Sequence, residues 1–438
     1  MNYASNFKGK RITVMGLGLL GRAVGDARFL ASHGAELIVT DLKSAEDLGD
    51  SVAQLAEFPN VSFVLGEHRL EDFRDRDFIL KAAGVPLHSP YIEEAKKHGI
   101  PVKMSASWFM ELSDVPVVGV TGTRGKSTVT HMIHAILEEA GWPNLLGGNV
   151  RGVSTLALLD EAKDDMIALF ELDSWQLQGF GDARLSPDVS VFTTFLADHM
   201  NYYPDMDTYL ADKANIFLNQ EATDTLVLGS QCAELVEEKY GDRIKAHTIV
   251  AGAHDFRSDW ELKVPGEHNR YNAALAVEAA RALDIDDEVI ERALANFPGV
   301  QGRLSLVRTV DGIDFYNDTN STTPDATMVA LEALKESKKP IVLIMGGTDK
   351  GLDMSALVGV LPKSTKHIAL LAGTGTERIK ESLPDVSIFA SLEEALGDAR
   401  THAAAGDAIV LSPGFASFGM FKNEYDRGDR FEALVNSL

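Results

Sequence analysis

Short apolar runs recur along the chain, and stretches with helical spacing separate several of them. The runs lie at residues 11–15, 36–40, 78–80, 117–121, 166–170, 189–195, 313–316, 340–345, 367–371 and 408–411. Continuous runs of this length, rich in Val, Ile, Leu and Phe, are typical of parallel strands that are buried on both faces. Between the fourth and fifth runs, Val129, Ile133 and Leu137 follow the period of a helix. This alternation predicts an α/β protein built from parallel sheets.

The run at 117–121 leads directly into a glycine-rich loop and then into a helix. The loop and the first helical turn read Gly122, Thr123, Arg124, Gly125, Lys126, Ser127 and Thr128. A strand, such a loop and a helix in this order form a phosphate-binding loop, whose backbone N–H groups face an anion. Lys126 would meet the outer phosphates of ATP, and the Ser127 hydroxyl could bind Mg²⁺. The general motif has its first glycine where Val120 stands, so an accidental Gly-Lys-Ser turn is the competing interpretation.

A second glycine pattern follows the strand expected at 11–15. Gly16, Gly18 and Gly21 form G-x-G-x-x-G, and Asp41 ends the next strand, about twenty residues later. This is the fingerprint of a dinucleotide-binding domain. Two functions fit it equally well. One is an NAD-dependent oxidoreductase, and the other is a Rossmann-like domain that holds a different nucleotide diphosphate at the same helix N-terminus.

The length of 438 residues is enough for roughly three domains of ordinary size. Pro116 interrupts the chain just before the phosphate-loop strand. Beyond about residue 300, strands again end in short glycine-rich loops, which indicates a further doubly wound domain. We therefore expect a Rossmann-like domain at 1–113, a central P-loop ATPase-type domain with a parallel sheet at 114–300, and a C-terminal Rossmann-like domain at 301–438.

Polar residues follow the carboxyl ends of two expected strands in the central domain. Glu171 follows the run at 166–170, and His199 follows the run at 189–195. Ligands of open α/β sheets bind beyond these strand ends. Lys213 falls at the edge of the apolar stripe of the next helix. This lysine is either functional or a solvated charge whose stem covers apolar surface.

Composition and charge narrow the class of protein further. The net charge of −24 argues against a nucleic-acid partner, because phosphate contacts need a basic face. The single cysteine, Cys232, excludes an internal disulfide framework and a cysteine-rich zinc site. We see no secretory signal before the first strand and no apolar stretch near the length of a membrane span. We expect a cytoplasmic protein without membrane insertion.

Several separated motifs resemble those of the Mur ligase family, and most closely its glutamate-adding branch. They are residues 122–128, Gly148-Asn149, Glu171 with Ser174 and Gln176, Asp198-His199-Met200, Lys213, His268-Asn269 with Asn272, Arg303, Asn317-Asp318, Gly346-Gly347 with Lys350, Ser412-Pro413 and Phe421-Lys422-Asn423. The resemblance spans nearly the whole chain, and motifs in this order are highly specific. The loop with valine at position 120 is also similar to this family's own loop.

The resemblance implies an ATP-dependent ligase of peptidoglycan precursor synthesis, which we expect to be a monomer. The alanyl carboxylate of UDP-N-acetylmuramoyl-L-alanine would attack the γ-phosphate of ATP, and glutamate would then attack the resulting acyl phosphate. Lys126 and a Mg²⁺ held by Ser127 and Glu171 would neutralise the phosphate charges. His199 would bind a second Mg²⁺, supported by Lys213 if this lysine is carbamylated.

The resemblance also implies which residues bind the three substrates. The sugar nucleotide would lie near Gly18, Leu19, Asp41, Lys43, Asn149 and His199. ATP would contact the loop at 122–128 together with Asn269, Asn272, Arg303 and Asp318. From their place at a helix start, the two asparagines could equally be caps. The incoming amino acid would meet Thr322, Lys350, Ser417 and Phe418.

The chain departs from the family pattern at four positions. Asn320 replaces a common lysine and Glu424 replaces an aromatic residue near the amino-acid pocket, so D-glutamate, L-glutamate and another amino acid all stay open. Asp173 and Trp175 replace the usual serine and phenylalanine. Two other classes of protein are disfavoured. An NAD-dependent oxidoreductase does not explain the phosphate loop at 122–128. A non-catalytic nucleotide-binding protein does not explain the presence of Glu171, His199 and Lys213, the candidate metal ligands.

Overall fold

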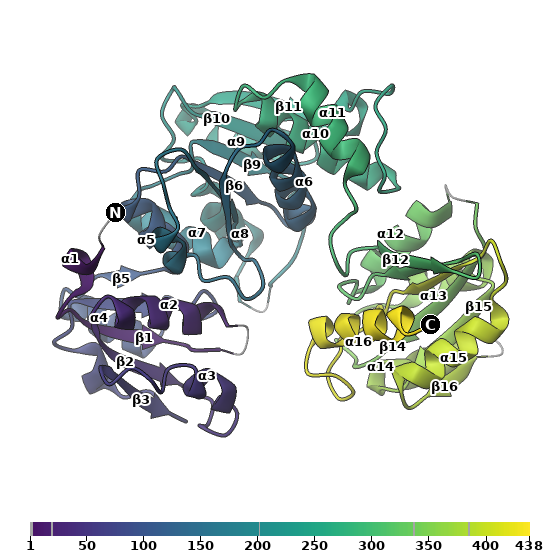
Figure 1. Cartoon of the computed structure of the whole chain (residues 1–438), viewed down its shortest axis with the longest axis horizontal. Coiled ribbons are helices and arrows are strands. Elements are labelled where there is room, and N and C mark those ends of the chain that lie inside the picture. Colours follow the sequence, from purple (N-terminus) through teal and green to yellow (C-terminus); the bar gives the residue numbers. More distant parts are fainter. Residues whose placement is uncertain (1–2, 19–20, 201, 336–337, 384–385) are drawn as a thin grey trace. The chain divides into compact units, whose positions relative to one another are not determined.

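The computed structural model describes residues 3–18, 21–200, 202–335, 338–383 and 386–438. The chain forms two compact units: Met1–Phe256 with Tyr271–Ala293, and Arg257–Arg270 with Leu294–Leu438. The first unit holds two sheets and the second unit holds one (Figure 1). The α/β class and the three-sheet architecture predicted from the sequence are confirmed.

The first sheet has the strand order β3-β2-β1-β4-β5, and every neighbouring pair is parallel. Its strands are β1 (Arg11–Met15), β2 (Glu36–Asp41), β3 (Val61–Leu65), β4 (Phe78–Lys81) and β5 (Val102–Lys103). The accompanying helices are α1 (Ala4–Phe7), α2 (Arg22–Ser32), α3 (Gly49–Ala53), η1 (Leu70–Phe73), α4 (Pro90–Lys97) and α5 (Ser105–Leu112). The chain direction across the sheet reverses between β1 and β4, which is where such sheets bind ligands.

The second sheet has the order β11-β10-β9-β6-β8-β7 and is also parallel throughout. Its strands are β6 (Val117–Thr121), β7 (Asn144–Gly148), β8 (Ile167–Glu171), β9 (Val189–Phe192), β10 (Thr225–Gly229) and β11 (His247–Ala251). The helices are α6 (Lys126–Glu139), η2 (Leu156–Asp160), α7 (Ser174–Ala183), α8 (Met206–Ala214), α9 (Ala233–Tyr240), η3 (Gly241–Arg243), η4 (Ala253–Asp255), α10 (Glu267–Arg281) and α11 (Asp287–Asn296). Because β6 lies between β8 and β9, the phosphate loop and the residues after both neighbours share one edge.

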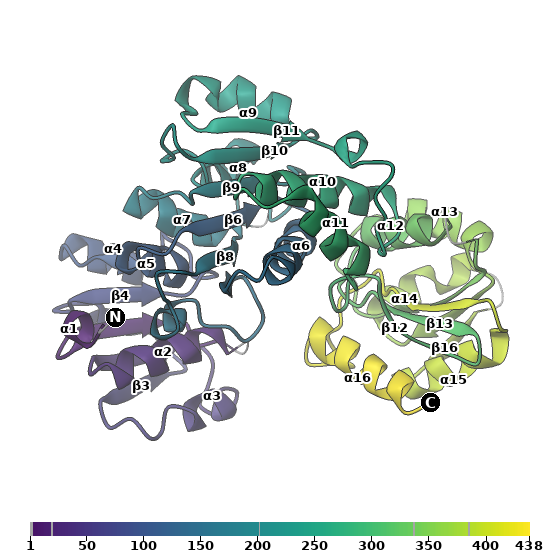
Figure 2. The ribbon, with the colours of Figure 1, turned by 45° about the horizontal axis from the view of Figure 1, so that its top comes forward.

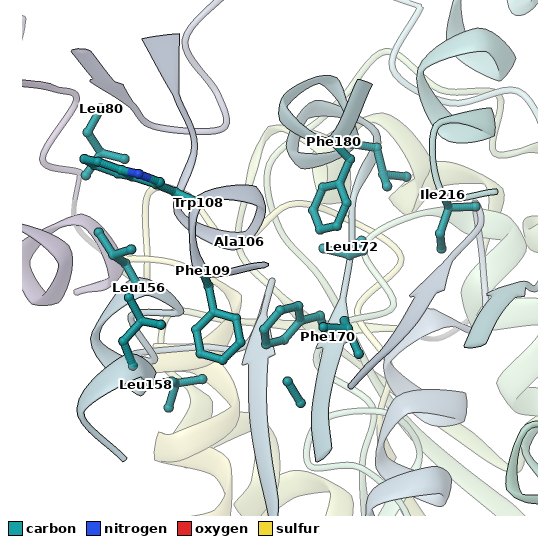
Figure 3. Close-up of a cluster of buried hydrophobic side chains, with 14 of the residues drawn as sticks. Leu80, Ala106, Trp108, Phe109, Leu156, Leu158, Phe170, Leu172, Phe180 and Ile216 are labelled. Carbon is teal, nitrogen blue, oxygen red and sulfur yellow. The ribbon is translucent and has the colours of Figure 1, made fainter. Parts of the chain in front are cut away.

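One apolar cluster joins the first two sheets through α5. Trp108 packs against Phe78, with ring centroids 5.1 Å apart, and Phe109 packs edge-on against Phe170 of β8 at 5.2 Å. Figure 3 shows Trp108, Phe109 and Phe170 among leucines of both domains. Burial of the apolar side chains in this shared cluster stabilises the contact between the first domain and the second. The boundary expected at residues 113 and 114 stays a prediction, as does the one at 300 and 301.

The third sheet has the order β12-β13-β17-β14-β15-β16. Its strands are β12 (Ser305–Val310), β13 (Ile313–Asn317), β14 (Ile341–Gly346), β15 (His367–Leu371), β16 (Ser387–Phe389) and β17 (Ala408–Leu411). Its helices are α12 (Pro324–Lys335), α13 (Ser355–Ser364), α14 (Thr374–Ile379), η5 (Lys380–Ser382), α15 (Leu392–His402) and α16 (Glu424–Asn436). Only the β12–β13 pair is antiparallel (Figure 2). The apolar-run pattern did not predict β12, because this edge strand is largely solvated and has no buried run.

Within the described residues, no helix has the length and apolar character that crossing a bilayer requires.

Candidate active site

The phosphate loop between β6 and α6 is held open by two glycines and by the chain after β9. Gly125 has φ +88° and Gly122 has φ +142°, both in the region that favours glycine. A Cβ atom at Gly122 would lie 2.0 Å from Thr193 Oγ1, so no side chain fits there. The Thr123 and Arg124 N–H groups donate to the carbonyl and hydroxyl oxygens of Thr194, at 2.7 and 2.9 Å. The loop is therefore preorganised by the neighbouring strand.

Lys126 and Ser127 occupy the first turn of α6. The Lys126 Nζ donates to the carbonyl oxygens of Gly122 and Thr123, at 3.0 and 3.2 Å, so the ammonium lies over the loop. The Ser127 side chain is buried beside the loop. An ammonium and a hydroxyl in these positions suit an anionic phosphate chain and its metal ion.

Lys213 of α8 lies beneath the same loop. It is fully buried, so the interpretation as a solvated surface charge is wrong. Its Nζ donates to the Gly122 carbonyl at 2.8 Å and lies 4.9 Å above the Tyr209 ring. Burial, and then the nearby positive charge of Lys126, hold the pKa of Lys213 well below its usual range. Both lysines thus share one carbonyl acceptor.

Glu171 ends β8 next to the loop, with Val120 as its partner in β6. Its carboxylate is buried and accepts a hydrogen bond from Asn149 Nδ2 at 3.3 Å. The Asn149 N–H also donates to the Glu171 carbonyl at 2.6 Å, and Arg22 Nη1 donates to Asn149 Oδ1. Arg22, at the start of α2, was not among the predicted site residues. Its position directly after the first glycine motif is the only signal in the sequence.

His199 follows β9 in a left-handed conformation with φ +57°. Its imidazole packs against the Trp175 ring, with centroids 4.7 Å apart, and burial lowers its pKa. The positive charges of Lys126 and Lys213 lower this pKa further. Trp175, a departure from the family pattern, therefore supports the histidine directly. Asp173, the adjacent departure, caps α7 by accepting the Gln176 N–H at 2.8 Å.

The first domain presents a cavity of about 510 Å³ at the switch point of its sheet. Gly18, Asp41 and Lys43, which the resemblance assigns to the sugar nucleotide, line this cavity. The Asp41 carboxylate accepts hydrogen bonds from the N–H groups of Leu17, Gly18 and Lys43, at 2.8 to 3.0 Å. Asp41 thus fastens the glycine loop as well as facing the cavity. Leu19, also predicted here, lies outside the described residues.

Two buried ionisable groups of this cavity were not predicted. Lys81 at the end of β4 donates to the Val85 carbonyl at 2.6 Å, and burial lowers its pKa to about 8. Asp26 of α2 accepts hydrogen bonds from the hydroxyls of Ser105 and Ser154, at 2.8 and 2.5 Å. Burial raises the pKa of Asp26 to about 6. This carboxyl therefore ties the first domain to α5 and to the second domain.

We expect Asp26→Asn to flatten the pH dependence of stability. The raised pKa means that the folded state binds the proton more tightly than the unfolded state, so stability is lost as pH rises from about 4 through about 6. The asparagine oxygen can still accept both serine hydroxyls. Measured by urea unfolding, the gain in the free energy of unfolding from pH 7.5 to pH 4.5 should be about 2 kcal/mol smaller in the variant than in the unaltered chain. Asp50→Asn, on an exposed carboxylate, is the control. An unchanged difference between the two pH values would contradict this role.

In the second unit, Asp318 is buried after β13. Ser412 Oγ donates to its carboxylate at 2.7 Å and the Leu304 N–H donates at 3.0 Å. Burial raises its pKa to about 6, an effect that nearby Arg303 opposes. The carboxylate thus joins β13 to β17 and to the segment before β12.

The residues predicted for the amino acid lie in the same unit. Lys350 Nζ donates to Thr322 Oγ1 at 2.8 Å, so two of them meet. Ser417 is buried, whereas Phe418 is 62% exposed. Of the two departures near this pocket, Glu424 begins α16, and its carbonyl accepts the Thr319 hydroxyl at 2.8 Å. Asn320 is only partly buried.

The two asparagines that the resemblance assigns to ATP fall in different units. Asn272 belongs to the first unit and lies against the phosphate loop, since a Cβ atom at Gly125 would come within 2.5 Å of Asn272 Oδ1. Asn269 belongs to the second unit, where its Nδ2 donates to the Pro265 carbonyl at 2.7 Å.

Three family models match successive parts of the chain. The Mur ligase MurD-like N-terminal domain matches residues 10–104, the Mur ligase middle domain matches 120–259, and the Mur ligase glutamate ligase domain matches 302–415. Together the matched segments include most residues that line the first-domain cavity, the phosphate loop and the strands of the third sheet. An NAD-dependent oxidoreductase, the alternative allowed by the first glycine motif, is therefore wrong.

Individual relatives extend over almost the full length. The UDP-N-acetylmuramoylalanine--D-glutamate ligase of Roseiflexus sp. (strain RS-1) is 36% identical over 98% of this chain and 99% of its own. The enzymes of that name from Borreliella burgdorferi (strain ZS7) and Treponema pallidum (strain Nichols) are 35% and 30% identical over 98% of both chains.

Solved structures share the fold at lower identity. The UDP-N-acetylmuramate-alanine ligase MurC of Thermotoga maritima has a TM-score of 0.62 and 19% identity over 98% of this chain and 99% of its own. MurF ligase from the same organism, in complex with ADP, has a TM-score of 0.60 and 16% identity over 100% of this chain and 97% of its own. Full-length relatives above 30% identity and three consecutive family models show that this chain belongs to the Mur ligase family.

Proposed function

We propose that this ATP-dependent Mur ligase joins D-glutamate to the alanyl carboxylate of UDP-N-acetylmuramoyl-L-alanine, releasing ADP and phosphate. The observation that carries the proposal is the full-length similarity to relatives named as D-glutamate ligases of this substrate. The arrangement of Lys126, Glu171, His199 and Lys213 around one sheet edge supports it. ATP and sugar nucleotides are cytoplasmic metabolites, so we place the reaction in the cytoplasm, carried out by a monomer.

The reaction has two steps with distinct electrostatic demands. In the first, an oxygen of the substrate carboxylate attacks the γ-phosphorus of ATP, the P–O bond to the β-phosphate breaks, and ADP leaves. Both reactants are anions, so positive charge must offset their repulsion. Lys126 supplies that charge from a preorganised position over the loop, which the neighbouring strand holds in place.

In the second step, the glutamate amine attacks the acyl carbon, a C–N bond forms and the C–O bond to phosphate breaks. The amine releases a proton to water during the attack, and inorganic phosphate leaves. Lys350 and Thr322 would hold the carboxylate end of the glutamate, and Ser417 and Phe418 would complete this pocket. ATP would contact four further residues, which are Asn269, Asn272, Arg303 and Asp318.

The residues present fit two magnesium ions. Ser127 and Glu171 offer a hydroxyl and a buried carboxylate, the hard oxygen donors that Mg²⁺ prefers. His199 would hold a second ion together with a carbamate on Lys213. When bound, Mg²⁺ supplies charge neutralisation at the phosphates and the acyl oxygen. Asn149, hydrogen-bonded to Arg22, orients the Glu171 carboxylate for this task.

The surroundings of Lys213 favour a carbamate. In the described part of the chain, its hydrogen-bond acceptors are the Gly122 carbonyl and the Thr121 hydroxyl, both uncharged. The charges of Asp173, Asp198 and Asp212 offset only part of the cost of burying an ammonium beside Lys126, and none of the three accepts a hydrogen bond from it in the described residues. Reaction of the neutral amine with CO₂ forms an N–C bond, releases one proton and converts the position to an anion suited to a metal ion.

The sugar nucleotide would occupy the first-domain cavity. Lys43 and Arg22 line this cavity together with Gly18, and two cationic side chains suit a diphosphate. Leu19 belongs to the same glycine loop in the sequence.

Replacing Lys350 with glutamine should raise the KM for glutamate roughly 10- to 100-fold, because a charged hydrogen bond to a carboxylate is lost. The KM for ATP should change little. Initial rates of phosphate release at varied glutamate and at varied ATP measure both constants. Lys363→Gln, on α13, is the matched control. Equal changes in the two KM values would contradict a role in amino-acid binding.

The proposed function is tested by phosphate release with UDP-N-acetylmuramoyl-L-alanine, ATP and a panel of amino acids that includes both glutamate enantiomers. We expect turnover with D-glutamate and at least tenfold less with L-glutamate. A preference for another amino acid would overturn the assigned acceptor while leaving the ligase chemistry intact. No phosphate release with any amino acid would overturn the function.

A further inference from the structure

A cluster of three metal-ligating side chains lies in the third domain and includes none of the residues discussed above. His367 begins β15, and Asp398 and His402 lie four residues apart at the end of α15, which packs on the sheet beside β15 (Figure 1). The glycine-rich loops follow the opposite, carboxyl ends of the strands. Since β15 runs for five residues, His367 is roughly 13 Å from that edge.

The three side chains already converge. His367 Nε2 lies 2.7 Å from Asp398 Oδ2, and His402 Nδ1 lies 3.6 Å from Asp398 Oδ1. The two imidazole rings stack with centroids 3.6 Å apart and planes inclined by 10°. One ligand atom from each residue lies within 4.8 Å of the other two. A tetrahedral zinc site brings its ligand atoms to about 3.3 Å, so these side chains would move closer together when an ion binds.

Charge and exposure also suit a cation. The Asp398 carboxylate places a negative charge beside the two imidazoles. The neighbouring cation Lys366 is held by Asp407, with Nζ and Oδ2 2.6 Å apart. His367 and Asp398 are 15% and 19% exposed, whereas His402 is 46% exposed. The cluster is therefore anchored on one side and open to water and to an entering ion on the other.

We propose that His367, Asp398 and His402 bind one divalent transition-metal ion, with Zn²⁺ as the best match, and that this ion fastens the end of α15 to the start of β15. Two imidazoles, one carboxylate and a water complete a four-coordinate site. Mg²⁺ prefers oxygen ligands alone, so the magnesium of the ligase reaction would not occupy it. The ion stabilises the third domain and takes no part in the chemistry.

The test uses the full-length protein after treatment with a chelator and in excess Mg²⁺, titrated with ZnCl₂ by calorimetry and with CoCl₂ by visible absorption. We expect one equivalent of Zn²⁺ at micromolar Kd, a Co²⁺ absorption band in the visible, and a Tm that rises with Zn²⁺ concentration. His402→Gln and Asp398→Asn should each weaken binding at least tenfold. Both variants should keep ligase activity.

Two controls locate the ion. His33→Gln alters another histidine beside an aspartate, Asp160, at 3.1 Å, and should bind Zn²⁺ like the unaltered chain. His199→Gln reports any Zn²⁺ at the active site and should also leave the measured equivalent in place. The proposal is overturned if the unaltered chain binds no Zn²⁺ at 100 µM, if His402→Gln and Asp398→Asn bind as it does, or if only His199→Gln loses the ion.

Discussion

Replacing Lys126 with methionine should lower kcat for phosphate release by about a thousandfold while the protein stays folded. The Lys126 ammonium lies over the loop that would cradle the phosphates, held by the Gly122 and Thr123 carbonyls. Methionine keeps the length and apolar stem of the side chain but removes the charge that offsets the repulsion between carboxylate and ATP. Steady-state phosphate release at saturating substrates, with thermal unfolding as a folding check, measures the effect.

Lys245→Met is the matched control for this prediction. The Lys245 ammonium pairs with the exposed Glu221 at 3.1 Å, so its loss should change kcat by less than twofold. If Lys126→Met kept a tenth or more of the activity, the Lys126 charge would not be what offsets the repulsion between the carboxylate and ATP.

Lys213→Met should abolish activity to a similar degree, by about a thousandfold, and for a different reason. Removing a buried ammonium whose acceptors are neutral should not lower the free energy of unfolding, because the desolvation cost of the charge disappears with it. What disappears for catalysis is the carbamate that would support a metal ion. Phosphate release and urea unfolding of the same variant separate these two effects.

Carbon dioxide provides the second half of this experiment. Depleting bicarbonate from the unaltered chain should lower kcat reversibly, and adding it back should restore the rate. The residual rate of Lys213→Met should not respond. A rate in the unaltered chain that is insensitive to bicarbonate, with substantial activity in Lys213→Met, would contradict a carbamate at this position.

Motifs that combine a strand, a loop and a helix were predictable because local sequence determines all three parts. The phosphate loop after β6 and the glycine loop after β1 appear where their patterns placed them. Glu171 and His199 followed from the rule that ligands bind at strand ends. Each of these predictions needed only a short window of the chain.

Contacts between distant segments were not predictable in the same way. Arg22 reaches Asn149 across 127 positions, and Asp26 meets Ser154 across 128. The local sequence around α2 does not indicate that its polar residues contact a second domain. Lys81 could not be predicted either. From the sequence, a lysine at the end of an apolar strand is expected to be solvated, and only the structure shows the carbonyl oxygens that accept its hydrogen bonds.

Isotope tracing tests the acyl-phosphate step, because it follows the oxygen atoms of the substrate carboxylate into the products. UDP-N-acetylmuramoyl-L-alanine labelled with ¹⁸O in its terminal carboxylate is incubated with the chain, ATP and D-glutamate, and the products are analysed by mass spectrometry. If the substrate carboxylate is activated as an acyl phosphate beside Lys126 and Lys213, one ¹⁸O atom is transferred into inorganic phosphate in every turnover. Unlabelled phosphate, or label appearing in AMP, would contradict it.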